Sequence, residues 1–160
     1  MSSTKKNTIY RVFLAVLIIA TLSFIWSNSL ADATESTNRS DAVIDKIKPI
    51  VDPNGNISSA HFEFLVRKAA HFSEFVLLGA EIYLMFSTFD RWRRISVKSF
   101  LLPVVCSFVC AVTDEILQLF SDGRAFSIYD MMIDLAGIVT GCAAILIVRL
   151  AVARAVKKRK

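Results

Sequence analysis

The stretch IYDMMIDLAGIVTGCAAILIVRL, residues 128–150, decides the fold class of this chain. It has about the length that an α-helix needs to cross a hydrocarbon core roughly 30 Å thick. Three more apolar runs of similar length precede it, at residues 9–26, 64–86 and 99–120. The sequence therefore predicts an all-α integral membrane protein, built as a bundle of about four transmembrane helices.

The overall composition agrees with a membrane environment. Of the 160 residues, 54% are hydrophobic and the mean hydropathy is +0.52, which is too apolar for a chain exposed to water on all sides. The three cysteines all lie within apolar runs and lack the paired spacing of a zinc site, so we interpret them as free, packed thiols. We treat residues 1–160 as a single membrane domain.

The distribution of Lys and Arg predicts the orientation, because basic residues beside a span are retained on the cytoplasmic side. Most of them fall in cytoplasmic segments if both termini lie inside. The basic tail at residues 151–160 then needs only topology or anionic lipid as its explanation, and no nucleic-acid partner is expected. The predicted localisation is a multi-pass protein of the cytoplasmic membrane with both termini in the cytoplasm.

The first span has an alternative interpretation as a cleaved signal peptide. Lys5, Lys6 and Arg11 precede its apolar run, and Ala31-Asp32-Ala33 offers an A-x-A cleavage site. We favour an uncleaved anchor, and a mature protein that begins near Thr34 would exclude it.

The segment at residues 27–63 is the one long connection, and it is predicted to lie outside the cell membrane. It is rich in Ser, Thr, Asn and Asp, and it ends in a turn signal at residues 52–55. Apolar residues recur at helical spacing after Ser40, which predicts a short extracytoplasmic amphipathic helix on the membrane face or over the bundle. These residues are Val43, Ile44, Ile47, Ile50 and Val51. A polar loop with no recognition role is the alternative.

Three of the four spans carry ionisable or polar residues on one face, and such groups are costly in lipid unless they face a partner or water. The stripes are Arg67, Lys68, His71, Glu74 and Glu81 on the second span, Asp114, Glu115 and Gln118 on the third, and Asp130 and Asp134 on the fourth. Gly137 and Gly141 continue the last stripe and let a neighbouring helix approach closely. The three stripes are therefore expected to meet.

The depth of these residues points to one site near the outer surface. With a rise of about 1.5 Å per residue, five residues come out roughly 3 to 15 Å below that surface, with Arg124 in the loop above them. They are His71, Glu74, Asp114, Asp130 and Asp134. Acidic groups outnumber basic ones there, and protonation of a carboxyl group, protonation of His71 or binding of a divalent cation would relieve the surplus.

The candidate residues divide into two sets by their chemistry. The candidate acid/base cluster consists of His71, Glu74, Asp114, Glu115 and Asp130, and the candidate binding residues are Lys68, Gln118, Arg124 and Asp134. Other interpretations stay open for several of them. Arg67 and Lys68 would also suit lipid headgroups, His71 and Glu74 would also suit a helix-stabilising pair, and Asp122-Gly123-Arg124 would also suit a tight turn. Glu81 lies nearer the cytoplasmic end and is left out of the site.

The same blocks resemble those of the VanZ-like family. Residues 67–79, RKAAHFSEFVLLG, resemble its K-x-x-H-F-x-E-[FY]-x-x-L-G block, and residues 114–137 resemble its D-E-x-x-Q-x-F, G-R and D-x-x-x-N-x-x-G blocks. Residues 26–29 look like its W-S-x-S ending. Asp134 departs from the pattern, because it stands where Asn is expected. The resemblance covers nearly the whole chain and implies a small bacterial membrane protein, in a family named for a member associated with low-level resistance to the glycopeptide teicoplanin.

Three hypotheses for the function follow. The first is an outer-leaflet polar site that binds or processes an envelope lipid or glycan component, or contributes to glycopeptide resistance, with membrane lipid and an envelope lipid or glycopeptide as partners. The second is a proton- or cation-coupled transporter, which would have to form a homo-oligomer. The third is a structural or regulatory membrane partner. No nucleophile motif, phosphate-binding glycine loop or H-E-x-x-H motif is present in the sequence, so no enzyme class is assigned.

Overall fold

The computed structural model describes residues 3–92 and 94–158 as helices joined by short connections, with no strand in these ranges. The elements are α1 (Ser3–Ser29), α2 (Ala33–Val51), α3 (Ser59–Ser87), the 3₁₀ helix η1 (Asp90–Trp92), α4 (Val97–Gln118) and α5 (Ile128–Lys158). Four of them, α1, α3, α4 and α5, are long and apolar enough to cross a membrane. The predicted all-α bundle with about four spans and an additional amphipathic helix is confirmed.

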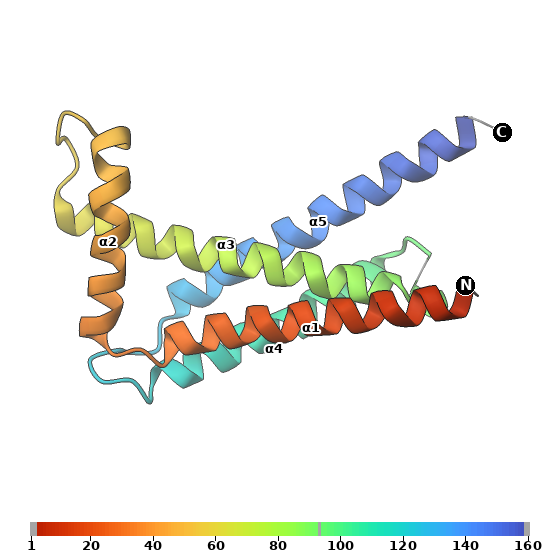
Figure 1. The fold of residues 1–160 in the computed structure, drawn as a ribbon, viewed down its shortest axis with the longest axis horizontal. Helices are drawn as coiled ribbons and strands as arrows, with labels where there is room; N and C mark the ends of the chain where they lie inside the picture. The colour runs from red at the N-terminus through yellow and green to blue at the C-terminus, as the bar shows by residue number, and fades with distance from the viewer. Residues whose placement is uncertain (1–2, 93, 159–160) are drawn as a thin grey trace.

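Helix α3 is the centre of the bundle and contacts each of the other four α-helices. Figure 1 shows α1, α3 and α4 running roughly along one direction, while α5 crosses them obliquely and diverges toward the C-terminus. Helix α2 stands across one end of the bundle, and both chain ends lie at the other. We call the first of these the α2 end.

The long connection is more helical than the sequence predicts. Helix α2 begins before the predicted apolar stretch because Asp32 caps it, accepting a hydrogen bond from the Glu35 backbone N–H at 2.8 Å. Glu35 and Arg39 then pair one turn apart in the added segment. After the helix, the two carboxylate oxygens of Asp52 accept hydrogen bonds from the backbone N–H groups of Asn56 and Ile57, just after the predicted turn. The chain therefore enters α3 in a defined direction.

Glycines allow α3 and α5 to make backbone contact. A Cβ on Gly137 would lie 2.5 Å from the Phe72 carbonyl oxygen, and one on Gly79 would lie 2.7 Å from the Ile138 carbonyl oxygen. The buried Cys142 thiol donates to the Gly79 carbonyl at 3.3 Å in the same interface. This close approach sets the polar stripes of α3 and α5 against each other.

The apolar core lies around this contact and takes its residues from α1, α3, α4 and α5. Its fully or nearly fully buried members are Ile25, Phe75, Leu78, Tyr83, Ala111, Ile138 and Cys142. At the far end, the Arg11 guanidinium donates to the Thr88 carbonyl at 2.8 Å and joins α1 to the end of α3. The candidate site residues His71 and Glu74 lie instead at the α2 end, where they line a cavity together with residues of α2.

Candidate functional site

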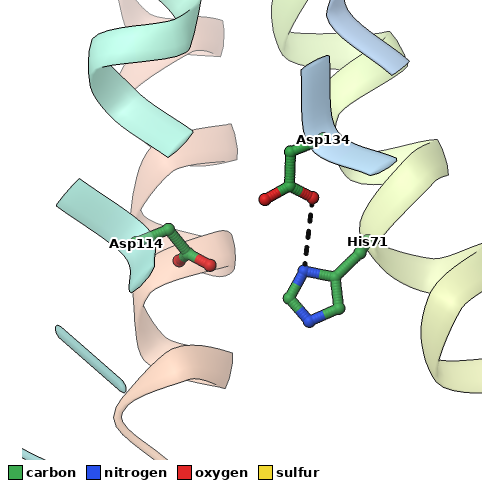
Figure 2. A group of neighbouring side chains, drawn as sticks. All are labelled: His71, Asp114 and Asp134. Atoms are coloured by element: carbon green, nitrogen blue, oxygen red, sulfur yellow. Dashed lines mark ion pairs between the residues drawn. The ribbon is translucent and has the colours of Figure 1, made fainter. Parts of the chain in front are cut away.

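Three helices each contribute one ionisable side chain to a common point at the α2 end. His71 comes from α3, Asp114 from α4 and Asp134 from α5, and Figure 2 shows the three side chains turned toward one another. One ligand atom from each lies within 4.8 Å of the other two. Both aspartates are fully buried, and the His71 side chain keeps 13% of its exposure.

The two aspartates differ in how they are held. The Ser29 hydroxyl donates to Oδ1 of Asp114 at 2.6 Å, and the Gln118 amide donates to its Oδ2 at 3.2 Å. Within the described residues, neither carboxylate oxygen of Asp134 has a hydrogen-bond partner. Nδ1 of His71 lies 3.5 Å from Oδ1, within the range of an ion pair (Figure 2). A buried carboxylate without donors is costly, so Asp134 requires a partner of some kind.

Glu74 and Glu115 flank this cluster and play different parts. Glu74 accepts a hydrogen bond from the Asn28 amide at 3.1 Å and lines a cavity next to His71. Glu115 is fully buried and accepts from the Ser127 backbone N–H at 2.7 Å. That bond joins α4 to the loop before α5. Glu115 does not line the cavity, so its contact is a structural one.

Lys68 and Asp130 form an ion pair with each other. They border a second cavity of about 340 Å³, which His71 and Arg67 also line. The Lys68 ammonium also lies over the Phe64 ring, 5.2 Å from its centre. Lys68 is therefore placed mainly as the counter-ion of Asp130.

Arg124 closes the α2 end from the loop between α4 and α5. Its Nη1 donates to the Asn28 carbonyl at 2.9 Å and lies 3.5 Å from the Ser29 carbonyl, where α1 ends. Burial lowers the pKa of the Arg124 guanidinium from its ordinary value, and the nearby positive charge of Arg67 lowers this pKa further. The two arginines therefore repel each other across a shared space.

That space is an open cavity of about 470 Å³ beneath α2. Its polar lining includes three arginines, Arg39, Arg67 and Arg124, together with His71 and Glu74. Its apolar lining consists of Phe24, Val43, Val66 and Ala70. The lining of the cavity thus combines cationic side chains with an apolar wall.

Several residues of this cavity are absent from the candidates taken from the sequence. Arg39 is one of them, because only the crossing of α2 over the bundle brings it there, where it donates to the Asn28 side-chain oxygen at 2.6 Å. Asn28 and Ser29 are two more, and they contact Glu74 and Asp114. The W-S-x-S ending after the first span was the sequence signal for this pair.

The family model described as VanZ/LLP1 matches residues 8–149. The chain belongs to this family. The match includes most of each of the four candidate spans, so the VanZ/LLP1 chain is a multi-pass membrane protein. No curated protein and no solved structure matches it significantly.

Proposed function

We propose that this VanZ/LLP1 protein binds the phosphate-bearing headgroup of an envelope lipid in the cavity beneath α2. The observation that carries the proposal is the pairing of three guanidinium groups with an apolar wall in one cavity. Arginine forks bind phosphate oxygens in pairs of parallel hydrogen bonds, and the apolar wall suits the first part of a lipid chain. A soluble anion would need no such wall.

Three guanidinium groups face one lining carboxylate, Glu74, so the charges of the cavity favour an anionic ligand. The positive charges of Arg67 and Arg124 repel each other, and this repulsion is stronger in a poorly hydrated cavity than in water. A phosphate bound between them would relieve this repulsion. The carboxylate of Glu35 offsets only the more exposed Arg39, which it contacts at 2.6 Å.

The proposed ligand reaches the cavity from the outer leaflet. The exposed basic residues at the end of α5, Arg154, Lys157 and Lys158, lie at the opposite end of the bundle from α2 (Figure 1). Retention of basic residues in the cytoplasm then puts both termini inside and the α2 end outside a bacterial cytoplasmic membrane. A protein that holds an envelope lipid there would alter the supply of that lipid to enzymes of the cell surface, which gives a route to glycopeptide resistance.

His71 and Glu74 would supply the chemistry if the lipid is processed. Both line the cavity, and they lie one helical turn apart on α3. An imidazole and a carboxylate in this arrangement can pass a proton to or from a bound headgroup.

Removing one guanidinium should weaken phosphate binding and leave the fold intact. We expect Arg67→Gln to weaken binding of farnesyl phosphate by about tenfold, because a charge-assisted pair of hydrogen bonds is lost. Binding is measured on the full chain in detergent micelles, with farnesol as the uncharged comparison ligand. The matched control is Arg91→Gln in η1, which removes an arginine beside Trp92 and away from the cavity.

The comparison with farnesol decides the proposal. If the wild-type protein binds farnesyl phosphate no better than farnesol, the cavity is not a phosphate site. Equal loss in the Arg67 and Arg91 variants would also contradict it, because the effect would then reflect net charge.

A further inference from the structure

The buried Asp134 carboxylate is the group that the lipid-binding proposal leaves unexplained. It is fully enclosed, it does not line the cavity, and neither of its oxygens has a hydrogen-bond partner among the described residues. Nδ1 of His71 is likewise without one. The 3.5 Å between this nitrogen and Asp134 Oδ1 is longer than a good hydrogen bond. The two groups face each other, yet direct bonding does not satisfy them.

The same separation suits two ligands of one metal ion. Ligands about 2.1 Å from an ion, at tetrahedral or octahedral angles, lie about 3.0 to 3.4 Å apart. The Nδ1 to Oδ1 distance of 3.5 Å is close to this range. Asp114 is the third candidate ligand, since one ligand atom from each of the three residues lies within 4.8 Å of the others, a looser spacing than that of a bound ion.

The surroundings of Asp114 are those of a ligand held in place. Ser29 and Gln118 fix its two oxygens from α1 and α4, which is the arrangement that outer hydrogen bonds give to metal-binding carboxylates. Three different helices supply the three side chains, so the positions are set by the bundle and not by a flexible loop (Figure 2).

We propose that His71, Asp114 and Asp134 bind one divalent transition-metal ion, Zn²⁺ or Mn²⁺, next to the cavity wall. Two carboxylates balance the charge of such an ion, and the ion would coordinate the Asp134 oxygens and the His71 Nδ1, which have no hydrogen-bond partner among the described residues. The imidazole ligand favours these ions over Mg²⁺ and Ca²⁺, which prefer sites made of oxygen atoms. The site rests on these three residues and is independent of the proposed lipid binding.

Asp134→Asn is the sharpest test, because it keeps the shape of the side chain and removes its charge. The full-length protein is purified in detergent, stripped with a chelator and dialysed against Zn²⁺ or Mn²⁺, and bound metal is measured by mass spectrometry. We expect about one ion per wild-type chain, and an affinity for that ion about 100-fold lower in the variant.

The matched control is Glu81→Gln, which neutralises another buried carboxylate on α3. Glu81 bonds to Thr21 at 3.1 Å and lies ten positions along the helix from His71 (on the order of 15 Å). We expect this variant to bind the ion as the wild type does. His71→Gln is a second ligand variant, with the same expected loss as Asp134→Asn.

The thermal stability of the wild type gives a readout that needs no variant. Zn²⁺ or Mn²⁺ should raise its melting temperature and a chelator should lower it, because the ion binds the folded state. A wild-type chain that takes up neither ion would overturn the proposal, and so would equal uptake by the Asp134→Asn and wild-type chains. A wild-type chain that takes up the metal ion but does not bind farnesyl phosphate would count against the lipid proposal alone.

Discussion

The variant Gly141→Leu is expected to lose the native packing of the bundle. A Cβ at this position would collide with the Val76 carbonyl oxygen and lie 2.9 Å from the Ala80 backbone nitrogen, both on α3. Backbone atoms cannot turn aside as a flexible side chain does, so α3 and α5 must separate. We expect the free energy of unfolding to fall by about 3 kcal/mol or more, a large share of the stability of a small domain.

Unfolding by SDS in mixed micelles, followed by circular dichroism, measures this loss. Val139→Leu is the matched control, because it enlarges an exposed side chain two positions away on the same helix. It should unfold at the same SDS fraction as the wild type. If Gly141→Leu also unfolds at the SDS fraction of the wild type, α3 and α5 do not make the close backbone contact described above.

The variant Lys68→Met is expected to have the second largest effect, since it leaves the Asp130 carboxylate without its counter-ion. The two side chains keep only 21% and 12% of their exposure, so water replaces little of the lost interaction. Removal of one partner of a buried pair costs about 3 to 5 kcal/mol, and we expect about 2 to 3 here because the pair is not fully enclosed. The same SDS titration measures the loss.

Two further variants separate this effect from a general loss of charge. In the double variant Lys68→Met/Asp130→Leu no charge is left uncompensated, and most of the stability should return. Glu35→Gln breaks an ion pair whose side chains are 50% and 54% exposed, and it should cost less than about 0.5 kcal/mol. Equal losses from Lys68→Met and Glu35→Gln would show that the Lys68 pair is not a buried one.

The structure brings together most of the candidate residues taken from the sequence, but these residues differ in what they contact. His71, Asp114 and Asp134 meet, and Gln118 supports Asp114 from one turn away. Arg124 and Glu74 line the cavity, and Lys68 pairs with Asp130 beside it. Glu115 binds a loop amide. Helical periodicity puts all of these except the loop residue Arg124 on the correct faces. It cannot distinguish a cavity residue from one that holds the helices together.

The departure at Asp134 shows how one residue changes the inference. An amide at this position would offer its own donor to a neighbour, whereas a carboxylate offers only acceptors. In this fold the carboxylate faces His71 and no hydrogen-bond donor of any other described residue. The buried carboxylate without a hydrogen-bond donor that motivates the metal site therefore depends on a position that the family pattern does not lead one to expect.

The sequence by itself determined the membrane class, the four spans, the family and the end of the bundle at which charge gathers. These follow from composition, span length and periodicity, which are local properties of the chain. Only the tertiary structure decided that Arg39 reaches the cavity, that Lys68 is paired with Asp130, and that His71 lies against Asp134. The physical reason is that a helical pattern defines the faces of each helix, whereas the glycine contact of α3 with α5 and the crossing of α2 decide which faces meet.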